Sequence, residues 1–268
     1  MALPLFDPST DPGPDFAALI GRSGTDLPRV SDAGLNLAHA TTVVALKFAD
    51  GVIMAGDRRA TAGNVIAHRS MEKVFPADRY SAVAISGSAA IASEMVRLFQ
   101  VQLEHYEKVE GVALSLEGKA NQLAQMVRTN LGMAMQGFVA IPLYCGFDLT
   151  RSEGRIFDYD AAGGRYEEAD FQAAGSGGTY ARTTIRLGYR DALPSDDAIE
   201  LAILSLYEAA DADSATGGPD SVRGIYPVVA SVTARGFERL SDEDVARRFD
   251  VIIERRRESK GNAEGSLR

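Results

Sequence analysis

The order in which strand and helix patterns follow one another is the feature that most constrains the fold of this 268-residue chain. From residue 41 onward, runs of β-branched and apolar residues come in groups, separated by pairs of segments with helical spacing. Grouped runs of this kind predict stacked layers of antiparallel sheet and helix. We therefore expect an α+β fold, and a four-layer αββα sandwich with two antiparallel sheets between helix layers fits the order. Strands are expected at 41–57, 80–87, 139–149, 154–160, 165–174 and 226–234, followed by one more short strand, and helices at 89–107, 120–134, 179–187, 196–210 and 241–258.

Three details of this pattern are specific enough to compare with a structure. The runs TTVVALKF and GVIMAGD flank a turn signal at 49–51, which predicts a hairpin. In the second helix, apolar residues recur at helical spacing from Ala120 to Ala134 and give one continuous apolar face. Ser241 is the expected N-cap of the last helix.

The first 40 residues differ from the rest in composition. They contain five of the ten prolines and five aspartates against two arginines, which is typical of loops or disorder. This composition fits a flexible terminus and a removable pro-segment equally well. Within 41–240 nothing marks a linker between domains, so residues 41–268 are expected to form a single domain with a helical C-terminal tail.

The charge balance argues against several classes of partner. The formal net charge is −9 and the sequence pI is about 4.9, so no basic stripe is available to displace counterions from phosphates, and no nucleic-acid partner is expected. No apolar stretch approaches the ~18 residues of a membrane span, and the start lacks the pattern of a signal peptide. We expect a cytoplasmic protein that has no contact with a membrane.

Metal and thiol chemistry are not expected either. The one cysteine, Cys145, lies in the apolar run VAIPLYCGF, where a buried and inert thiol is the usual explanation. Three scattered histidines make no metal-ligand spacing. We therefore expect no metal ion and no organic cofactor.

A Thr-Thr pair opens the first strand directly after the unusual leader. Asp57 follows in MAGDRRAT and Lys73 in MEKVF. Each residue alone has a simple structural explanation, because Thr favours strands, GDRR fits a turn and Lys73 fits the surface. The residues by themselves leave both the structural and the catalytic interpretation open.

Taken together, however, these residues resemble a known family. The run from Thr41 to Phe75 is similar to the opening of actinobacterial 20S proteasome β subunits, which are N-terminal-nucleophile (Ntn) hydrolases that act as threonine peptidases. The segments AISGSAA, LEHYEKVEG, AAGSGG and DSATGGPDSVRGIYP match the family in the same order and with similar spacing. The resemblance covers residues from about 37 to about 233 and implies the Ntn-hydrolase sandwich.

The resemblance implies a role for each matching position. Thr41 would be the nucleophile, with Asp57 and Lys73 at the family's spacing from it, and Gly87 would offer its backbone N–H to the oxyanion. The supporting polar residues around the threonine would be Ser176, Asp213 and Thr216. The positions that line the substrate pocket in the family correspond to Ala60, Thr61, Met71, Ile85 and Ala89, and because none is charged we expect cleavage after apolar residues.

The implied chemistry needs a cleavage between Ala40 and Thr41. A threonine hydroxyl is a weak nucleophile that requires a base, and the α-amino group of Thr41, created by removal of residues 1–40, has an ordinary pKa near ~7.7–8.0. Before cleavage the same nitrogen is an amide and cannot act as a base. Relatives usually carry glycine before the threonine, and the Cβ of Ala40 leads us to expect slower self-processing.

Other interpretations stay open. A non-catalytic ring subunit or an unprocessed precursor would share the fold without activity. The simpler bacterial HslV-type peptidases share the Thr-Thr, Asp and Lys pattern, but their chains are shorter and lack DSATGGPD and LEHYEKVEG. Other Ntn hydrolases usually place Cys or Ser at the exposed position.

The resemblance also implies partners. The β chains would form seven-membered rings with copies of themselves, two rings stacked per particle, capped by rings of proteasome α subunits. A ring ATPase activator would feed unfolded or tagged protein substrates into the enclosed chamber.

Overall fold

The computed structural model describes residues 41–265, with side chains up to residue 258. These residues belong to the second of two compact units, which spans Asn36–Arg268. The leader, including Ala40, lies outside the described residues, so its removal stays a prediction.

Two five-stranded sheets, antiparallel throughout, form the centre of the described region. The first has the order β10-β1-β2-β11-β12 and the second the order β5-β6-β7-β8-β9. The first sheet consists of β1 (Thr42–Phe48), β2 (Gly51–Gly56), β10 (Phe171–Gly175), β11 (Val228–Thr233) and β12 (Gly236–Arg239). The second consists of β5 (Val74–Asp78), β6 (Ser81–Gly87), β7 (Ala140–Asp148), β8 (Glu153–Tyr159) and β9 (Arg165–Glu168).

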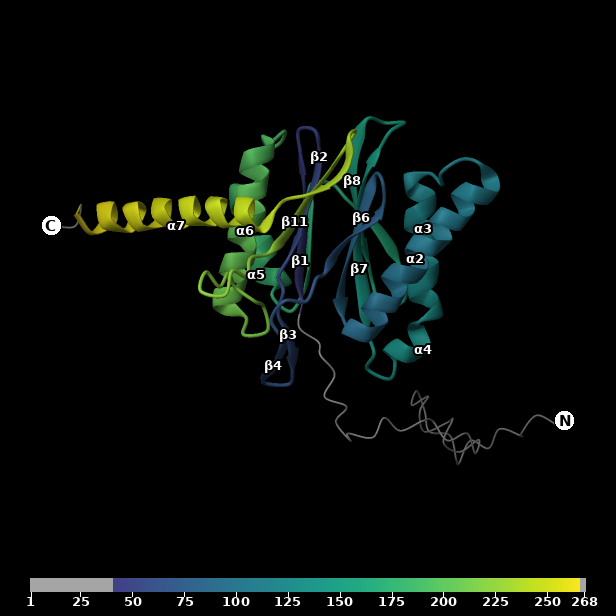
Figure 1. The fold of residues 1–268 in the computed structure, drawn as a ribbon, viewed down its shortest axis with the longest axis horizontal. Coiled ribbons are helices and arrows are strands. Elements are labelled where there is room, and N and C mark those ends of the chain that lie inside the picture. Colours follow the sequence, from purple (N-terminus) through teal and green to yellow (C-terminus); the bar gives the residue numbers. More distant parts are fainter. Residues whose placement is uncertain (1–40, 266–268) are drawn as a thin grey trace, which may run out of the picture. The chain divides into compact units, whose positions relative to one another are not determined.

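Helices cover the outer face of each sheet (Figure 1). Helices α5 (Gly178–Gly188) and α6 (Ser195–Ala212) pack on the first sheet, and α2 (Ala89–Glu110) and α3 (Leu116–Thr129) on the second. A third apolar cluster lies between the sheets and includes Val43, Ala45 and Cys145. The predicted four-layer αββα sandwich is thereby confirmed.

Strand β1 is apolar on both faces because both faces are covered. Val44 and Leu46 pack toward α5 and α6, whereas Val43 and Ala45 face the second sheet. Side chains alternate between the faces of a strand, so Thr42 shares the helix-facing side with Val44, and Thr41 lies on the side of Val43. The predicted hairpin is confirmed, since β1 and β2 pair from Val43↔Gly56 to Phe48↔Gly51.

Two expected elements are divided in the structure. The single strand expected at 165–174 is two strands, β9 and β10, which belong to different sheets, because the chain bends after Glu168 and crosses from one sheet to the other. The helix expected at 120–134 ends at Thr129, and a short helix α4 (Leu131–Ala134) follows. The apolar face therefore does not continue to Leu131, which is 39% exposed.

The remaining elements complete the sandwich. The short hairpin of β3 (Ala60–Ala62) and β4 (Val65–His68) forms a separate two-stranded sheet. The last helix, α7 (Asp242–Gly265), begins after Ser241, whose Oγ accepts a hydrogen bond from the Asp244 amide at 3.1 Å, so the predicted N-cap is confirmed. Arg248, Arg255 and Arg256 attach α7 to acidic residues of α6.

Cys145 is fully buried between the sheets, as the sequence predicts. Burial raises the pKa of its thiol well above the ordinary range, which makes the thiolate inaccessible at neutral pH.

Candidate active site

The main chain of Thr41 is held at the beginning of β1. Strand β10 ends opposite Thr42 at Gly175, and the next amide, that of Ser176, donates to the Thr41 carbonyl oxygen at 3.0 Å. Gly175 has φ +96°, and a Cβ placed on it would lie 1.7 Å from that same carbonyl oxygen. Only glycine permits this approach, so the position of Thr41 depends on the residue type at 175.

The Asp57 carboxylate is the centre of the site. It follows β2, is fully buried, and accepts four hydrogen bonds. Its Oδ1 accepts from the Thr42 amide at 2.8 Å and from Lys73 Nζ at 2.5 Å. Its Oδ2 accepts from the amides of Arg59 at 2.9 Å and Gly217 at 2.8 Å. One carboxylate thereby joins its own segment to three others, at Thr42, Lys73 and Gly217, next to Thr41.

Lys73 lies immediately before β5 and is only 3% exposed. Its Nζ donates to Asp57 Oδ1 and, at 2.6 Å, to the Arg59 carbonyl oxygen. Burial lowers the pKa of Lys73 from its ordinary value, and the negative charge of Asp57 opposes this effect only in part. The site thus contains an ammonium group that burial has made more acidic, bound to the same Asp57 oxygen as the Thr42 amide.

A second polar group forms around Asp213. Its Oδ2 accepts hydrogen bonds from Ser176 Oγ and Thr216 Oγ1, both at 2.6 Å, and its Oδ1 accepts from the Ala215 amide. Burial favours the neutral form of Asp213, but the bonds from Ser176 and Thr216 outweigh it and hold the pKa of the carboxyl below its ordinary value. The structure therefore brings together the three supporting residues that the sequence predicts.

Gly87 ends β6 with φ +108°, where a Cβ would lie 2.1 Å from the Val139 carbonyl oxygen. This close approach of β6 to the segment before β7 requires glycine independently of any reaction. The expected role of the Gly87 amide as an oxyanion donor stays a prediction.

The five predicted substrate-pocket residues fall into two groups. Ala60, Thr61 and Met71 belong to the segment around β3, and Ile85 and Ala89 to the junction of β6 and α2. Ala60 and Ile85 are buried, whereas Thr61, Met71 and Ala89 are half-buried.

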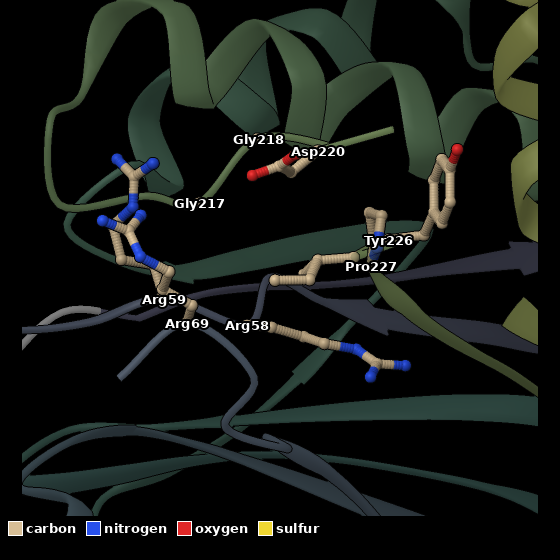
Figure 2. Close-up of a pocket in the computed structure, with 9 residues that line it drawn as sticks. Arg58, Arg59, Arg69, Gly217, Gly218, Asp220, Tyr226 and Pro227 are labelled. Carbon is tan, nitrogen blue, oxygen red and sulfur yellow. The ribbon is translucent and has the colours of Figure 1, made fainter. Parts of the chain in front are cut away.

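A different pocket lies beside Asp57, and it is positively charged (Figure 2). Arg58, Arg59 and Arg69 line it together with Gly217, and in Figure 2 the Arg58 side chain points away from the other two arginines. Two of these guanidinium groups have structural partners, since Arg58 Nη2 bonds Asp242 at 2.6 Å and Arg59 Nη1 bonds the Ser214 carbonyl oxygen at 2.9 Å. None of the five predicted substrate-pocket residues lines this pocket.

Three contributors to the site were missed in the sequence: Thr42, Gly177 and Gly217. The Gly177 amide donates to Thr42 Oγ1 at 3.0 Å, and Thr42 Oγ1 lies 2.6 Å from Thr216 Oγ1. Gly177 and Gly217 act through backbone amides and leave no side-chain signal. The alternation along the first strand was a usable signal for Thr42, because it puts a hydroxyl on a face that is otherwise apolar.

Among residues 41–265, no three His, Cys, Asp or Glu side chains are grouped so that they could hold a metal ion. No helix in this same part of the chain is both long and apolar enough to cross a membrane.

Comparison with known proteins assigns the family. A family model described as "Proteasome subunit" matches residues 37–223, which include every predicted site residue. The chain is 59% identical over 262 residues to "Proteasome subunit beta" of Acidimicrobium ferrooxidans, covering 96% of each chain. It is 53% identical over 229 residues to "Proteasome subunit beta" of Streptomyces griseus, covering 85% of this chain and 82% of the relative. The chain belongs to the proteasome subunit family, with the β subunits of actinobacteria.

Proposed function

We propose that this chain is a threonine-type endopeptidase, the catalytic β subunit of a 20S proteasome, with Thr41 as nucleophile once residues 1–40 are removed. The observation that carries the proposal is the buried Asp57 carboxylate, one oxygen of which binds both the Lys73 ammonium and the Thr42 amide. This arrangement places a cation and the first residue of β1 on one carboxylate, as the proposed mechanism requires.

The first chemical step transfers a proton within Thr41. The α-amino group takes the proton of the Thr41 hydroxyl while the hydroxyl oxygen attacks the substrate carbonyl carbon. Lys73 binds the same Asp57 oxygen as the Thr42 amide, and its positive charge would favour the unprotonated amine and stabilise negative charge at the oxygen. Asp57 holds Lys73 in place through a 2.5 Å bond.

The tetrahedral intermediate then collapses. Its oxyanion accepts a hydrogen bond from the Gly87 amide, and losing one such donor typically costs about 10²–10³ in rate. The Thr41 ammonium returns its proton to the leaving amine as the peptide bond breaks, which leaves an ester on the threonine oxygen. Water, activated by the same amine, hydrolyses the ester and restores the enzyme.

The same hydroxyl removes the leader. Attack of the Thr41 oxygen on the Ala40 carbonyl breaks the Ala40–Thr41 peptide bond, forms an ester between Ala40 and the Thr41 oxygen, and passes the hydroxyl proton to the nitrogen, which becomes the α-amino group. Water then hydrolyses the ester and releases residues 1–40, so the chain is a zymogen until it processes itself. Alanine at position 40 slows this step relative to glycine because a Cβ restricts the backbone there.

Specificity follows from the uncharged residues proposed to line the substrate pocket. Ala60, Thr61, Met71, Ile85 and Ala89 favour apolar side chains, so cleavage occurs after apolar residues in preference to acidic ones. As in its family, the chain would work in the cytoplasm within stacked seven-membered rings, with α subunits at the ends and a ring ATPase delivering unfolded or tagged proteins.

Co-expression with the α subunit tests this proposal most directly. The intact mass and N-terminal sequence of the β band should show a chain that begins Thr41-Thr42-Val43, and the particle should hydrolyse apolar fluorogenic peptides. The Thr41→Ala variant should keep its leader and show no hydrolysis. An assembled wild-type particle that retains residues 1–40 and cleaves no peptide would refute the proposal and leave a structural subunit.

A further inference from the structure

The Thr42 hydroxyl belongs to a buried chain of hydrogen bonds that ends on Asp213. The Gly177 amide donates to Thr42 Oγ1 at 3.0 Å, Thr42 Oγ1 and Thr216 Oγ1 are 2.6 Å apart, and Thr216 Oγ1 donates to Asp213 Oδ2 at 2.6 Å. We call these four groups the hydroxyl chain. Thr42 and Thr216 are both fully buried, so water cannot replace the bonds made by the Thr42 hydroxyl, whereas Asp213 at the end of the hydroxyl chain is half-buried.

Only one direction of donation satisfies every group. An ionised carboxylate has no proton to give, so Thr216 must donate to Asp213. Each hydroxyl has a single proton, so Thr216 is left to accept from Thr42, and Thr42 in turn accepts from Gly177. The low pKa of Asp213 keeps this direction fixed at neutral pH.

The hydroxyl chain has no room for a side chain at position 177. A Cβ on Gly177 would lie 2.4 Å from Thr216 Oγ1 and 2.6 Å from Thr42 Oγ1. Threonine is β-branched and stiff at χ1, so a fixed hydroxyl also fixes the backbone of β1 at its first residue.

Three separate contacts therefore converge on Thr42 and the residue before it. The Thr42 amide binds Asp57, the Thr42 hydroxyl binds Thr216 and Gly177, and the Thr41 carbonyl oxygen accepts from the Ser176 amide. The first two contacts place the Thr42 backbone relative to two different carboxylates. Because Thr41 is bonded directly to that backbone, its orientation is set by them.

We infer that Thr42 is a positioning residue for the Thr41 nucleophile, acting through the hydroxyl chain. This inference rests on the proposed function and assigns a role to a residue that neither touches substrate nor exchanges a proton with it. The competing explanation is a buried hydroxyl that only stabilises the fold. Positioning predicts a loss in the chemical step, because small displacements of a reacting group cost much more rate than binding.

The test uses the full chain co-expressed with its α subunit, in the variants Thr42→Val, Thr42→Ser, Thr216→Val and the double variant with valine at both positions. Leader removal is followed by intact mass, since this intramolecular cleavage contains no substrate-binding step. The processed fraction then gives kcat and KM on an apolar peptide. Ser205→Ala is the matched control, because Ser205 is a fully buried hydroxyl that bonds only within α6, to the Ala202 carbonyl oxygen.

Thr42→Val is expected to slow leader removal and lower kcat by about tenfold or more, with KM changed by less than about twofold. Thr42→Ser keeps the hydroxyl and should retain most of the rate, and Ser205→Ala should keep all of it. Because the hydroxyl chain acts as a unit, the double variant should be about as slow as the slower single variant. A wild-type rate in Thr42→Val, or a change confined to KM, would overturn the inference.

Amide hydrogen exchange separates this inference from the proposed function, because it needs no activity. Loss of the hydroxyl should accelerate exchange at Gly177, its direct donor, and also at Ser176, whose amide reports the position of Thr41. Faster exchange at both amides supports positioning even if the wild-type particle is inactive. Faster exchange at Gly177 alone, with Ser176 still protected, refutes it even if the particle is active.

Discussion

Two buried lysine–aspartate pairs lie at the two ends of β5. Lys73 directly precedes this strand and pairs with Asp57, whereas Asp78 is its last residue and pairs with Lys119 of α3. The two lysines are 3% and 6% exposed. The pairs are alike in charge and in the burial of the lysine, although the Asp57 side chain is fully buried and that of Asp78 is 22% exposed. Strand β5 separates them by roughly 16 Å at ~3.3 Å per residue.

The two pairs differ in which other groups bind the aspartate. Asp78 accepts from the Tyr80 amide and the Ser81 hydroxyl, so apart from Lys119 it caps its own turn. Asp57 also accepts from the amide two residues on, that of Arg59, but it accepts in addition from the amides of Thr42 and Gly217, which are 15 and 160 residues away in the sequence. A buried ion pair alone is therefore no evidence of a functional site. Asp57 is distinguished by the amides distant in the sequence that its carboxylate binds.

Replacing the lysine of each pair should give the largest difference in activity between the two pairs. Lys73→Met should lower leader removal and peptide hydrolysis by about 10²–10⁴-fold, because the cation proposed to assist Thr41 is lost. Lys119→Met should leave activity per assembled particle near the wild-type value but lower the free energy of unfolding by about 2–3 kcal/mol, less than for a fully buried pair because Asp78 is 22% exposed on its side chain.

Peptide hydrolysis per particle and chemical denaturation of both variants measure these effects. Equal losses of activity in the two variants would mean that Lys73 is structural. The Lys73–Asp57 pair would then have no functional role that distinguishes it from the Lys119–Asp78 pair.

Replacing each aspartate by asparagine should give a smaller but similar contrast. An asparagine at position 57 has one acceptor oxygen, so two of the four donors lose their partner, and activity should fall by about 10²-fold. Asp78→Asn should change activity by less than about threefold, since only a turn and α3 are affected. Steady-state hydrolysis, normalised to assembled particle by native mass spectrometry, distinguishes the two results, and comparable losses would contradict the assignment of the site to Asp57.

Two glycines with positive φ, Gly175 beside Thr41 and Gly236 in β12, allow the same comparison between the site and a region away from it. Gly175→Ala should lower the rate of leader removal by about 10–10²-fold, because its Cβ would collide with the Thr41 carbonyl oxygen and displace the nucleophile. Gly236, the first residue of β12, also has a positive φ, +115°, but its Cβ would meet the carbonyl oxygen of Arg79 in the turn between β5 and β6. Gly236→Ala should lower thermal stability without changing the rate measured on folded particles, and a similar rate loss in both variants would show that general strain is responsible.

The smallest effect concerns pH. The pKa of Lys73 is lowered in the folded protein, so between that value and the ordinary pKa of ~10.4 the unfolded chain binds a proton that the folded chain does not. Raising the pH through this window removes that advantage of the unfolded chain, and the wild type should gain stability relative to Lys73→Met. Between pH 7.5 and 10.5 the thermal midpoint of the wild type should rise by a few degrees relative to that of Lys73→Met. Lys119→Met retains Lys73 and should follow the wild type, and a constant difference between wild type and Lys73→Met would contradict the lowered pKa.

Much of the architecture was predictable because its patterns are strong. Long periodic helices and the apolar strands β1, β2, β6 and β7 carry their own signals. The split of 165–174 into β9 and β10 was not predictable, because one short polar bend decides which sheet each half joins. The end of α3 before Leu131 depends on the local geometry at Asn130, whose amide and side chain both bond the Met126 carbonyl oxygen.

The candidate site shows a similar division. Side chains with a fixed spacing, such as Asp57 and Lys73, were identified through resemblance, and the structure brings them into contact. The amides of Gly177 and Gly217 were not, because a backbone donor looks the same at every position. Their importance appears only once the chain has brought residues 42, 57 and 217 together.

Because β1 lies inside its sheet, its neighbours and the site around it are completed only by segments that are synthesised later. The first described strand of the chain lies between β2 and β10, and Asp57 is completed by an amide 160 residues further along. At synthesis rates of about 5–20 residues per second, that amide leaves the ribosome roughly 10–30 s after Asp57. Until then no arrangement of the early strands contains the finished carboxylate site. The topology therefore delays completion of the site around Asp57 until most of the chain has been synthesised.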